Sequence, residues 1–265
     1  MTAQIDIANT QDSAAVSGSD HRLVVHLDLF SGIGGFALAA QMVGGIETAA
    51  FCEIDPWARQ VLAKNFPNVP ICEDVKTLNP KHYGTIDLIT GGYPCQPFSA
   101  AGERRGEEDA RHLWPEMRRI IEAARPRWVL AENVAGHISM GLDEVLADLD
   151  AIGYAATATV IPACAVGAIH RRDRVWITAH DSRLGIPWDI EAKIPRLESL
   201  QGGEDGGRLA PLRDMPALPA SGLCRASDGI PRRVDRLRGL GNAIVPQVAA
   251  EILRCMMRVD SLHNV

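Results

Sequence analysis

The sequence predicts an α/β protein with a doubly wound, mainly parallel sheet. Short apolar runs alternate with helical patterns along the chain, and polar residues follow the ends of several runs. Of the 265 residues, 46% are hydrophobic and 23% are charged, as is usual for a globular protein, and the length suffices for a large domain and a small lobe. We therefore expect helices on both faces of the sheet and a ligand at its carboxyl edge.

Hydrophobic periodicity and turn residues place the individual elements. A glycine turn at Gly32, Gly34 and Gly35 separates the first strand from the first helix, and Pro56 suits the first turn of the second helix. The expected strands are 23–30, 46–52, 69–72, 86–90, 128–131, 157–161 and 174–178. The expected helices are 36–43, 56–66, 113–124, 142–152 and 247–257.

Composition divides the chain into three parts. Residues 1–21 are small and polar with neither the basic start nor the apolar stretch of a signal peptide, so we expect a disordered leader in a cytoplasmic protein. Residues 179–231 hold 7 Gly and 6 Pro without a clear period, which indicates a small irregular lobe. Residues 22–178 and 232–265 then form the main domain. No apolar run approaches the roughly 20 residues that span a membrane.

Charge and cysteine spacing limit the classes of partner and metal site that the sequence predicts. The formal net charge of −6 argues mildly against a nucleic-acid partner, although the arginines cluster, as in 171–174 and 232–238, and local fields matter more than the total. Arginine pairs also commonly decorate helix surfaces, so these clusters alone decide nothing. The six cysteines show no Cys-x-x-Cys spacing, and we expect no metal site.

Polar residues at the strand ends suggest a nucleoside cofactor. A glycine turn such as that at Gly32 brings backbone N–H groups close to a ligand, although such a turn is as often purely structural. Glu53 lies 21 residues beyond Gly32, a distance that suits hydrogen bonds to ribose hydroxyls, and Asp74 can accept from an adenine amino group. The Gly-x-Gly-Gly pattern differs from the dinucleotide fingerprint.

Cys95 and Glu132 are the candidates for chemistry. A thiol in the Pro-Cys-Gln turn after a strand can have a lowered pKa and act as a nucleophile, although most cysteines are buried and inert. Glu132 ends the next expected strand, and a carboxyl in a closed site can stay protonated and act as an acid. Glu132 and Asn133 could equally form a turn or a helix cap.

Five motifs in order resemble those of the bacterial and phage DNA (cytosine-5)-methyltransferase family: residues 28–35, 94–96, 132–134, 172–174 and 241–246. The resemblance covers about 22–178 and 232–257, and it implies a Rossmann-like S-adenosylmethionine-dependent methyltransferase fold. Three features depart from the family. His170 replaces a common Gln, residues 179–231 are short for a target-recognition lobe, and the usual motif before the last one is faint.

The resemblance implies a role for each matching residue. Cys95 would attack carbon 6 of a flipped cytosine, and Glu132 would protonate ring nitrogen 3. Arg174 would hold the base carbonyl with support from Arg172. Asn133, next to Glu132, is also implied to belong to the catalytic set. Residues implied to hold S-adenosylmethionine are Phe30, Gly32, Gly34, Glu53, Ile54, Asp74, Val75, Gly92, Pro94 and Asn242. Residues implied to contact double-stranded DNA are Gln96, Ser99, Arg104, Arg105, Arg111 and His170, several of them on a loop over 100–111 that would close over the base. We expect a monomer, with any cognate restriction endonuclease acting separately.

Three alternatives remain open at this point. An RNA cytosine methyltransferase uses the same chemistry, and one branch of the family acts on tRNA. A folate-dependent pyrimidine enzyme such as thymidylate synthase also attacks carbon 6 with a cysteine, but it would not need the series Gly32, Glu53 and Asp74. A DNA-binding protein with a dead site would not need Cys95, Glu132 and Arg174 together.

Overall fold

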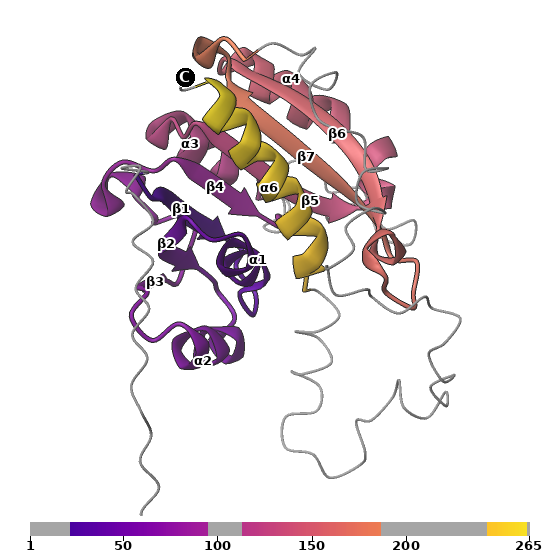
Figure 1. The fold of residues 1–265 in the computed structure, drawn as a ribbon. Coiled ribbons are helices and arrows are strands. Elements are labelled where there is room, and N and C mark those ends of the chain that lie inside the picture. The colour runs from indigo at the N-terminus through magenta and orange to yellow at the C-terminus, as the bar shows by residue number, and fades with distance from the viewer. Residues whose placement is uncertain (1–21, 95–112, 187–242, 264–265) are drawn as a thin grey trace, which may run out of the picture.

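The computed structural model describes residues 22–94, 113–186 and 243–263, and these form one seven-stranded sheet with helices on both faces (Figure 1). The expected leader, the 100–111 loop and nearly all of the expected irregular lobe lie outside the described residues. The strands are β1 Val24–Leu29, β2 Ile46–Cys52, β3 Ile71–Cys72, β4 Leu88–Gly91, β5 Trp128–Val134, β6 Tyr154–Pro162 and β7 Asp173–Asp181. The helices are α1 Gly35–Val43, α2 Pro56–Asn65, α3 Trp114–Ala124, α4 Leu142–Ala151 and α6 Pro246–His263, with short 3₁₀ turns η1 Pro80–Tyr83, η2 Ala135–Ser139, η3 Ala163–Val166 and η4 Ser182–Leu184.

The sheet order is β3-β2-β1-β4-β5-β7-β6, and the first five of these strands run parallel. β7 runs antiparallel to both of its neighbours. The predicted doubly wound, mainly parallel sheet is therefore confirmed. The antiparallel pairing also lengthens the strands beyond their predicted ends: β5 continues past residue 131 to Val134, and β7 continues past residue 178 to Asp181.

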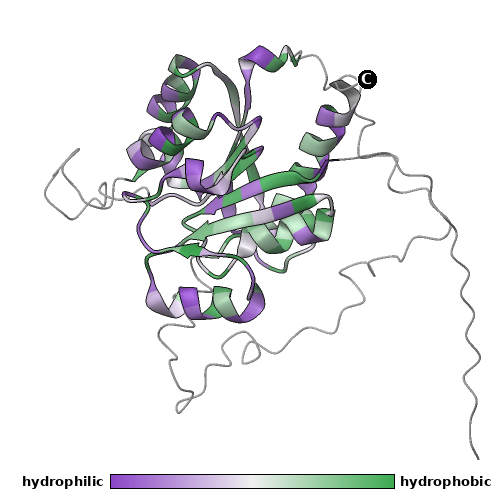
Figure 2. Ribbon diagram, turned by 90° about the vertical axis from the view of Figure 1, so that its left-hand side faces the viewer, coloured by the Kyte–Doolittle hydropathy of each residue, from purple (hydrophilic) through white to green (hydrophobic). Residues whose placement is uncertain are grey.

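Helices cover the two faces of the sheet in two groups. On one face α1 and α6 pack over the central strands, where the ring of Phe36 meets Trp176 of β7 edge-on with centroids 6.2 Å apart. On the other face the core includes buried side chains of α3 and α4, such as Met117 and Leu149. Figure 2 shows largely hydrophobic strands between helices that carry hydrophilic stretches. None of the helices within the described ranges has the length and apolarity to cross a bilayer.

α6 returns the end of the chain to the middle of the sheet. Asp260 near its end accepts from the Trp128 indole at 3.1 Å and pairs with Arg127, both at the start of β5. Leu253 and Val248 of the same helix are buried against the sheet. α6 also packs beside α1, the first helix in the described part of the chain.

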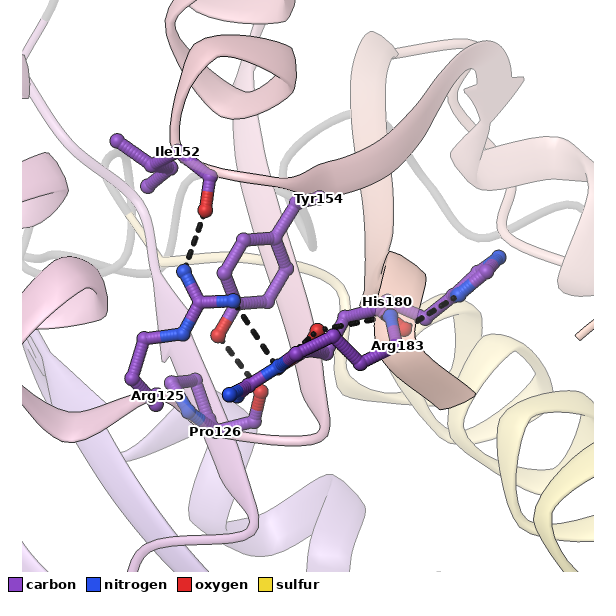
Figure 3. Close-up of polar contacts among 7 residues, drawn as sticks. Arg125, Pro126, Ile152, Tyr154, His180 and Arg183 are labelled. Carbon is purple, nitrogen blue, oxygen red and sulfur yellow. Dashed lines mark hydrogen bonds and ion pairs between the residues drawn. The ribbon is translucent and has the colours of Figure 1, made fainter. Parts of the chain in front are cut away.

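An ion-pair cluster around the buried Asp181 connects the end of β7 to the residues just before β5 (Figure 3). Asp181 is 4% exposed and accepts from Arg125 at 3.1 Å and from Arg183 at 3.0 Å. The guanidinium of Arg125 also lies 4.8 Å from the ring centroid of Tyr154, whose hydroxyl donates to the Pro126 carbonyl at 2.7 Å. The hydrogen bond from Arg183 is the main reason that the pKa of Asp181 is lowered to about 2.

An Asp181→Asn variant should be less stable at neutral pH but not at low pH. A carboxyl whose pKa falls on folding stabilises the protein above its unfolded value of 3.8, and that stabilisation is lost as the pH falls from about 4 to about 2. At 1.36 kcal/mol per pKa unit the whole shift would correspond to about 2 kcal/mol, and because the Arg183 side chain is mostly exposed, solvent screening reduces the expected loss to about 1 kcal/mol. Urea unfolding at pH 7 should show this loss, and the difference should vanish near pH 2.

Asp150→Asn on the exposed surface of α4 is the matched control, and it should change the free energy of unfolding by no more than about 0.5 kcal/mol. Equal effects of the two substitutions at pH 7 would show that the Asp181 cluster contributes no specific stability.

Candidate active site

The glycine turn after β1 is locked to the end of β2 by one carboxylate. The Gly32 backbone N–H donates to Glu53 Oε2 at 2.7 Å, and the Asp55 N–H donates to Glu53 Oε1 at 2.8 Å. Phe30, Gly32 and Gly34 have φ values of 52°, 53° and 89°, in the left-handed region that glycine adopts at least cost. Two predicted site residues, Gly32 and Glu53, are therefore in direct contact.

The space and charge around this turn fit a nucleoside that carries positive charge. A Cβ added at Gly32 would meet nothing within 4 Å, so the turn faces open space. Ile54 is 71% exposed beside Glu53, which offers an apolar surface to an adenine ring. The acids Glu53, Glu73 and Asp74 at this edge favour a sulfonium and an ammonium, and they disfavour the phosphates of a dinucleotide. The residues present thus suit S-adenosylmethionine.

Two buried residues of this region add to the predicted picture. The side chain of Val75 is 5% exposed and packs in the core, so it can reach a cofactor only through its backbone. Asp28, which the sequence did not single out as a site residue, lies fully buried beneath the turn and accepts from Thr90 at 2.9 Å. Burial is the main reason that the pKa of Asp28 is raised to about 8, so this carboxyl is largely neutral at pH 7.

The sequence predicted a strand over 128–131 with Glu132 just after it. In the structure Glu132 lies within β5, which continues to Val134. β4 pairs with β5 only as far as Ala131, so β7 alone holds the last three residues of β5. This leaves one side of Glu132 turned toward the exit of β4. Its Oε2 lies 3.5 Å from the position that a Cβ on Gly92 would occupy.

Arg174 of β7 holds Glu132 from the opposite side. Its Nε lies 2.8 Å from Glu132 Oε1, and both side chains are mostly buried. Burial raises the pKa of Glu132 to about 7, although the positive charges of Arg174 and Arg172 oppose the rise. A carboxyl near half-protonation at neutral pH can both give and take a proton, as a general acid requires.

Asn133 fixes the backbone that leads to Cys95. Its Nδ2 donates to the Tyr93 carbonyl at 3.1 Å, and its Oδ1 accepts from the Val134 N–H at 2.9 Å. The Tyr93 hydroxyl in turn lies 2.7 Å from Nε2 of His137 in η2. No local pattern predicts this pairing, because 44 residues separate Tyr93 from His137.

Arg172 connects the site to the segment before α6. Its Nη2 donates to the Ala243 carbonyl at 2.8 Å, and its own φ is 39°. The next residue, Ile244, packs on the first residue of α1: a Cβ added at Gly35 would lie 2.6 Å from Ile244 Cγ1. The contact requires a glycine at position 35, and it places the end of the chain beside the glycine turn.

A Gly35→Ala variant should therefore lose about 1–3 kcal/mol of stability, the usual cost of overpacking. It should also bind S-adenosylmethionine more weakly, because the clash falls at the glycine turn. Ile244→Ala alone removes apolar contact, but in the double variant it also removes the clash. Chemical unfolding of the four proteins should show the double variant no less stable than Ile244→Ala; additive losses would show that the two residues do not interact.

The remaining predicted residues divide by their place in the chain. His170 is exposed in the loop between η3 and β7, and Pro94 is exposed after β4. The structure does not describe Cys95, Gln96, Ser99, Arg104, Arg105, Arg111 or Asn242. Within the described ranges, no group of three His, Cys, Asp or Glu side chains is arranged to hold a metal ion.

Comparison with known proteins identifies the family of the chain. Residues 24–202 match the family model described as C-5 cytosine-specific DNA methylase. The chain is 36% identical to Type II methyltransferase M.HgiCII of Herpetosiphon aurantiacus over 61% of this chain and 38% of that protein. It is 35% identical to Type II methyltransferase M2.BsuMI of Bacillus subtilis over 58% of this chain and 41% of that protein. The chain thus spans about two-fifths of the length of these relatives.

A solved structure shares the fold. The crystal structure of a Spodoptera frugiperda DNMT2 mutant superposes with a TM-score of 0.55 and 26% identity, over 62% of this chain and 52% of that one. The shared part corresponds to a mainly parallel sheet flanked by helices.

Proposed function

The chain belongs to the C-5 cytosine-specific DNA methylase family, and from this premise we propose that it transfers a methyl group from S-adenosylmethionine to carbon 5 of cytosine in double-stranded DNA. The observation that carries the proposal is the buried Glu132–Arg174 pair, which lies against Gly92 at the exit of the strand that leads to Cys95. A half-neutral carboxyl with an arginine at 2.8 Å offers a proton and a hydrogen-bond donor to one pyrimidine ring.

In the proposed mechanism the Cys95 sulfur adds to carbon 6 of a cytosine turned out of the duplex. Glu132 gives its proton to ring nitrogen 3, and Arg174 donates to the carbonyl oxygen of the base. Arg172 would support Arg174. Its hydrogen bond to the Ala243 carbonyl would also hold the residue that follows Asn242 in place. Carbon 5 would then form a bond to the methyl group while the bond between the methyl group and the sulfonium sulfur breaks. A base then removes the carbon 5 proton, and the Cys95 sulfur leaves carbon 6.

The cofactor supplies an electrophilic methyl group on a sulfonium. Glu53 would accept from the ribose hydroxyls with the lone pairs that Gly32 and Asp55 leave available, and Ile54 would pack on the adenine. Asp74 would accept from the adenine amino group. Further contacts are assigned to Phe30, Gly34, Gly92, Pro94 and the backbone of Val75.

DNA would lie over the carboxyl edge of the sheet. We assign phosphate and base contacts to Gln96, Ser99, Arg104, Arg105 and Arg111, and a further one to His170, whose imidazole can hydrogen-bond in place of an amide. We assign the reading of flanking bases to residues 179–231, most of which lie outside the described residues. We propose that the protein acts as a cytoplasmic monomer without a metal ion, and that any cognate restriction endonuclease works separately.

Incubation with tritiated S-adenosylmethionine and either duplex DNA or tRNA tests the proposal directly. We expect radioactivity in duplex DNA, and bisulfite sequencing of DNA from cells that express the protein should then show protected cytosines in one sequence context. Label in tRNA alone would replace DNA with RNA as the substrate. Cofactor binding without transfer to either nucleic acid would contradict an enzymatic function.

A further inference from the structure

Two cysteines lie directly opposite each other at the carboxyl edge of β2 and β3. Cys52 ends β2, Cys72 ends β3, and the two residues are register partners. Neighbouring strands lie about 4.8 Å apart, and disulfides accept Cα separations of about 4.4–6.8 Å. Both side chains face the same core, with Cys52 inside it and Cys72 packed against it.

The two thiols differ in access. Cys52 is 3% exposed, whereas Cys72 is half-buried and donates a weak hydrogen bond to the Asp74 carbonyl at 3.5 Å. Burial and the neighbouring Cys72 thiol, to which Cys52 is hydrogen-bonded, raise the pKa of Cys52. An oxidant in solution would therefore meet the sulfur of Cys72 first, with the sulfur of Cys52 already beside it.

β3 can move to let the bond form. It is only two residues long, and it is an edge strand that pairs with β2 alone. β2 lies between β1 and β3 and is seven residues long. The Cβ atoms of a disulfide lie about 3.8 Å apart, so closure would draw the β3 end toward β2 and would carry Asp74 with it.

We propose that Cys52 and Cys72 form an oxidation site, in which a peroxide converts the two thiols into a disulfide. Formation of the disulfide weakens cofactor binding at the neighbouring residues Glu53 and Asp74. Cys72 attacks a peroxide oxygen to give a sulfenic acid and water. The Cys52 sulfur then attacks the Cys72 sulfur and expels a second water, so two thiols and one hydrogen peroxide yield one disulfide and two waters. The two electrons pass from the sulfurs to the peroxide.

The consequence for binding rests on the proposed function. Glu53 directly follows Cys52, and Asp74 is the second residue after Cys72. These carboxylates are the proposed partners of the ribose and the adenine, so a change in the spacing of β2 and β3 changes the distance between them. Dithiothreitol, which reduces the disulfide to two thiols, would restore the original spacing.

The test uses the full chain with Cys95→Ser, so that oxidation of the proposed nucleophile does not contribute. After treatment with hydrogen peroxide, non-reducing peptide mass spectrometry should find one peptide pair linked through residues 52 and 72. Calorimetry with S-adenosylmethionine should show roughly tenfold weaker binding, equivalent to about 1.4 kcal/mol, and dithiothreitol should restore it. Added Cys72→Ser or Cys52→Ala should abolish both the link and the loss of affinity.

Cys164→Ser is the matched control, because Cys164 is exposed in η3 and should not affect either result. Absence of the link while Cys164 is oxidised in the same sample would overturn the proposal, as would a link without any change in affinity. A reduced protein that binds no S-adenosylmethionine would refute the proposed function instead, and the peptide map would still report on the cysteine pair.

Discussion

A Cys95→Ala variant should transfer no measurable methyl group to DNA while it binds S-adenosylmethionine as tightly as the unchanged protein. Without the sulfur, carbon 5 of cytosine never becomes nucleophilic, so the loss should reach the detection limit of a tritium assay. Gly32 and Glu53, the proposed cofactor residues, follow β1 and β2, so the substitution at residue 95 should leave the hydrogen bond between them intact. Cys255→Ala, exposed on α6, serves as the control and should keep full activity.

The same prediction has a covalent readout. A duplex with 5-fluorocytosine at the target position should form an adduct that survives denaturing electrophoresis, because fluorine cannot leave as a proton does. Peptide mapping should place the adduct on Cys95, and the alanine variant should form none. Wild-type turnover in the Cys95→Ala protein would refute the mechanism.

A Glu132→Gln variant should reduce kcat/KM by roughly 10²–10⁴, the usual contribution of a general acid. Glutamine keeps the shape of the side chain but has no acidic proton for ring nitrogen 3. The measurement is the initial rate of methylation at pH 7, with Glu122→Gln on the exposed surface of α3 as the control. If the variant keeps more than half of the wild-type kcat/KM, Glu132 is not the general acid.

The pH dependence of this variant has a definite sign. With a pKa of about 7, Glu132 loses its proton as the pH rises, so wild-type kcat/KM should fall above about pH 7, and this limb should be missing in the variant. Because folding raises the pKa from 4.5, the stability that Glu132 contributes is present below pH 4.5 and is lost as the pH rises through about 7. As the pH rises from 4.5 to about 7, the wild-type protein should therefore lose about 3 kcal/mol of unfolding free energy that the Glu132→Gln variant keeps.

Local sequence patterns predicted the order and type of the helices and strands well, because the apolar period and turn residues that define each element lie within that element. The period of the apolar residues placed the helices to within a few residues, except for α6, which continues to His263 and not to residue 257. The distance between Gly32 and Glu53 predicted that both residues serve a nucleoside site, and the structure adds a hydrogen bond between them that was not predicted. Strand ends were harder, since the pairing with β7 decides where β5 stops.

Contacts between distant segments could not be predicted from spacing. The sequence contains no signal that Arg172 would donate to Ala243, 71 residues away, or that Asn133 would hold the Tyr93 carbonyl. The pairing of Cys52 with Cys72 depends on the register between β2 and β3, which only the folded sheet fixes. The structure describes neither Cys95 nor Asn242, so their roles stay predictions.

The edge-on contact between Phe36 and Trp176 has a consequence for any attempt to redesign the enzyme. Trp176 is the register partner of Glu132, and Phe36 is the second residue of the helix that starts at the glycine turn. The proposed acid and the proposed cofactor turn are therefore connected through the packing of Phe36 on Trp176. Engineers who reshape this turn for a bulkier sulfonium donor should expect the acidity profile of the reaction to change as well, and they should select for both properties at once.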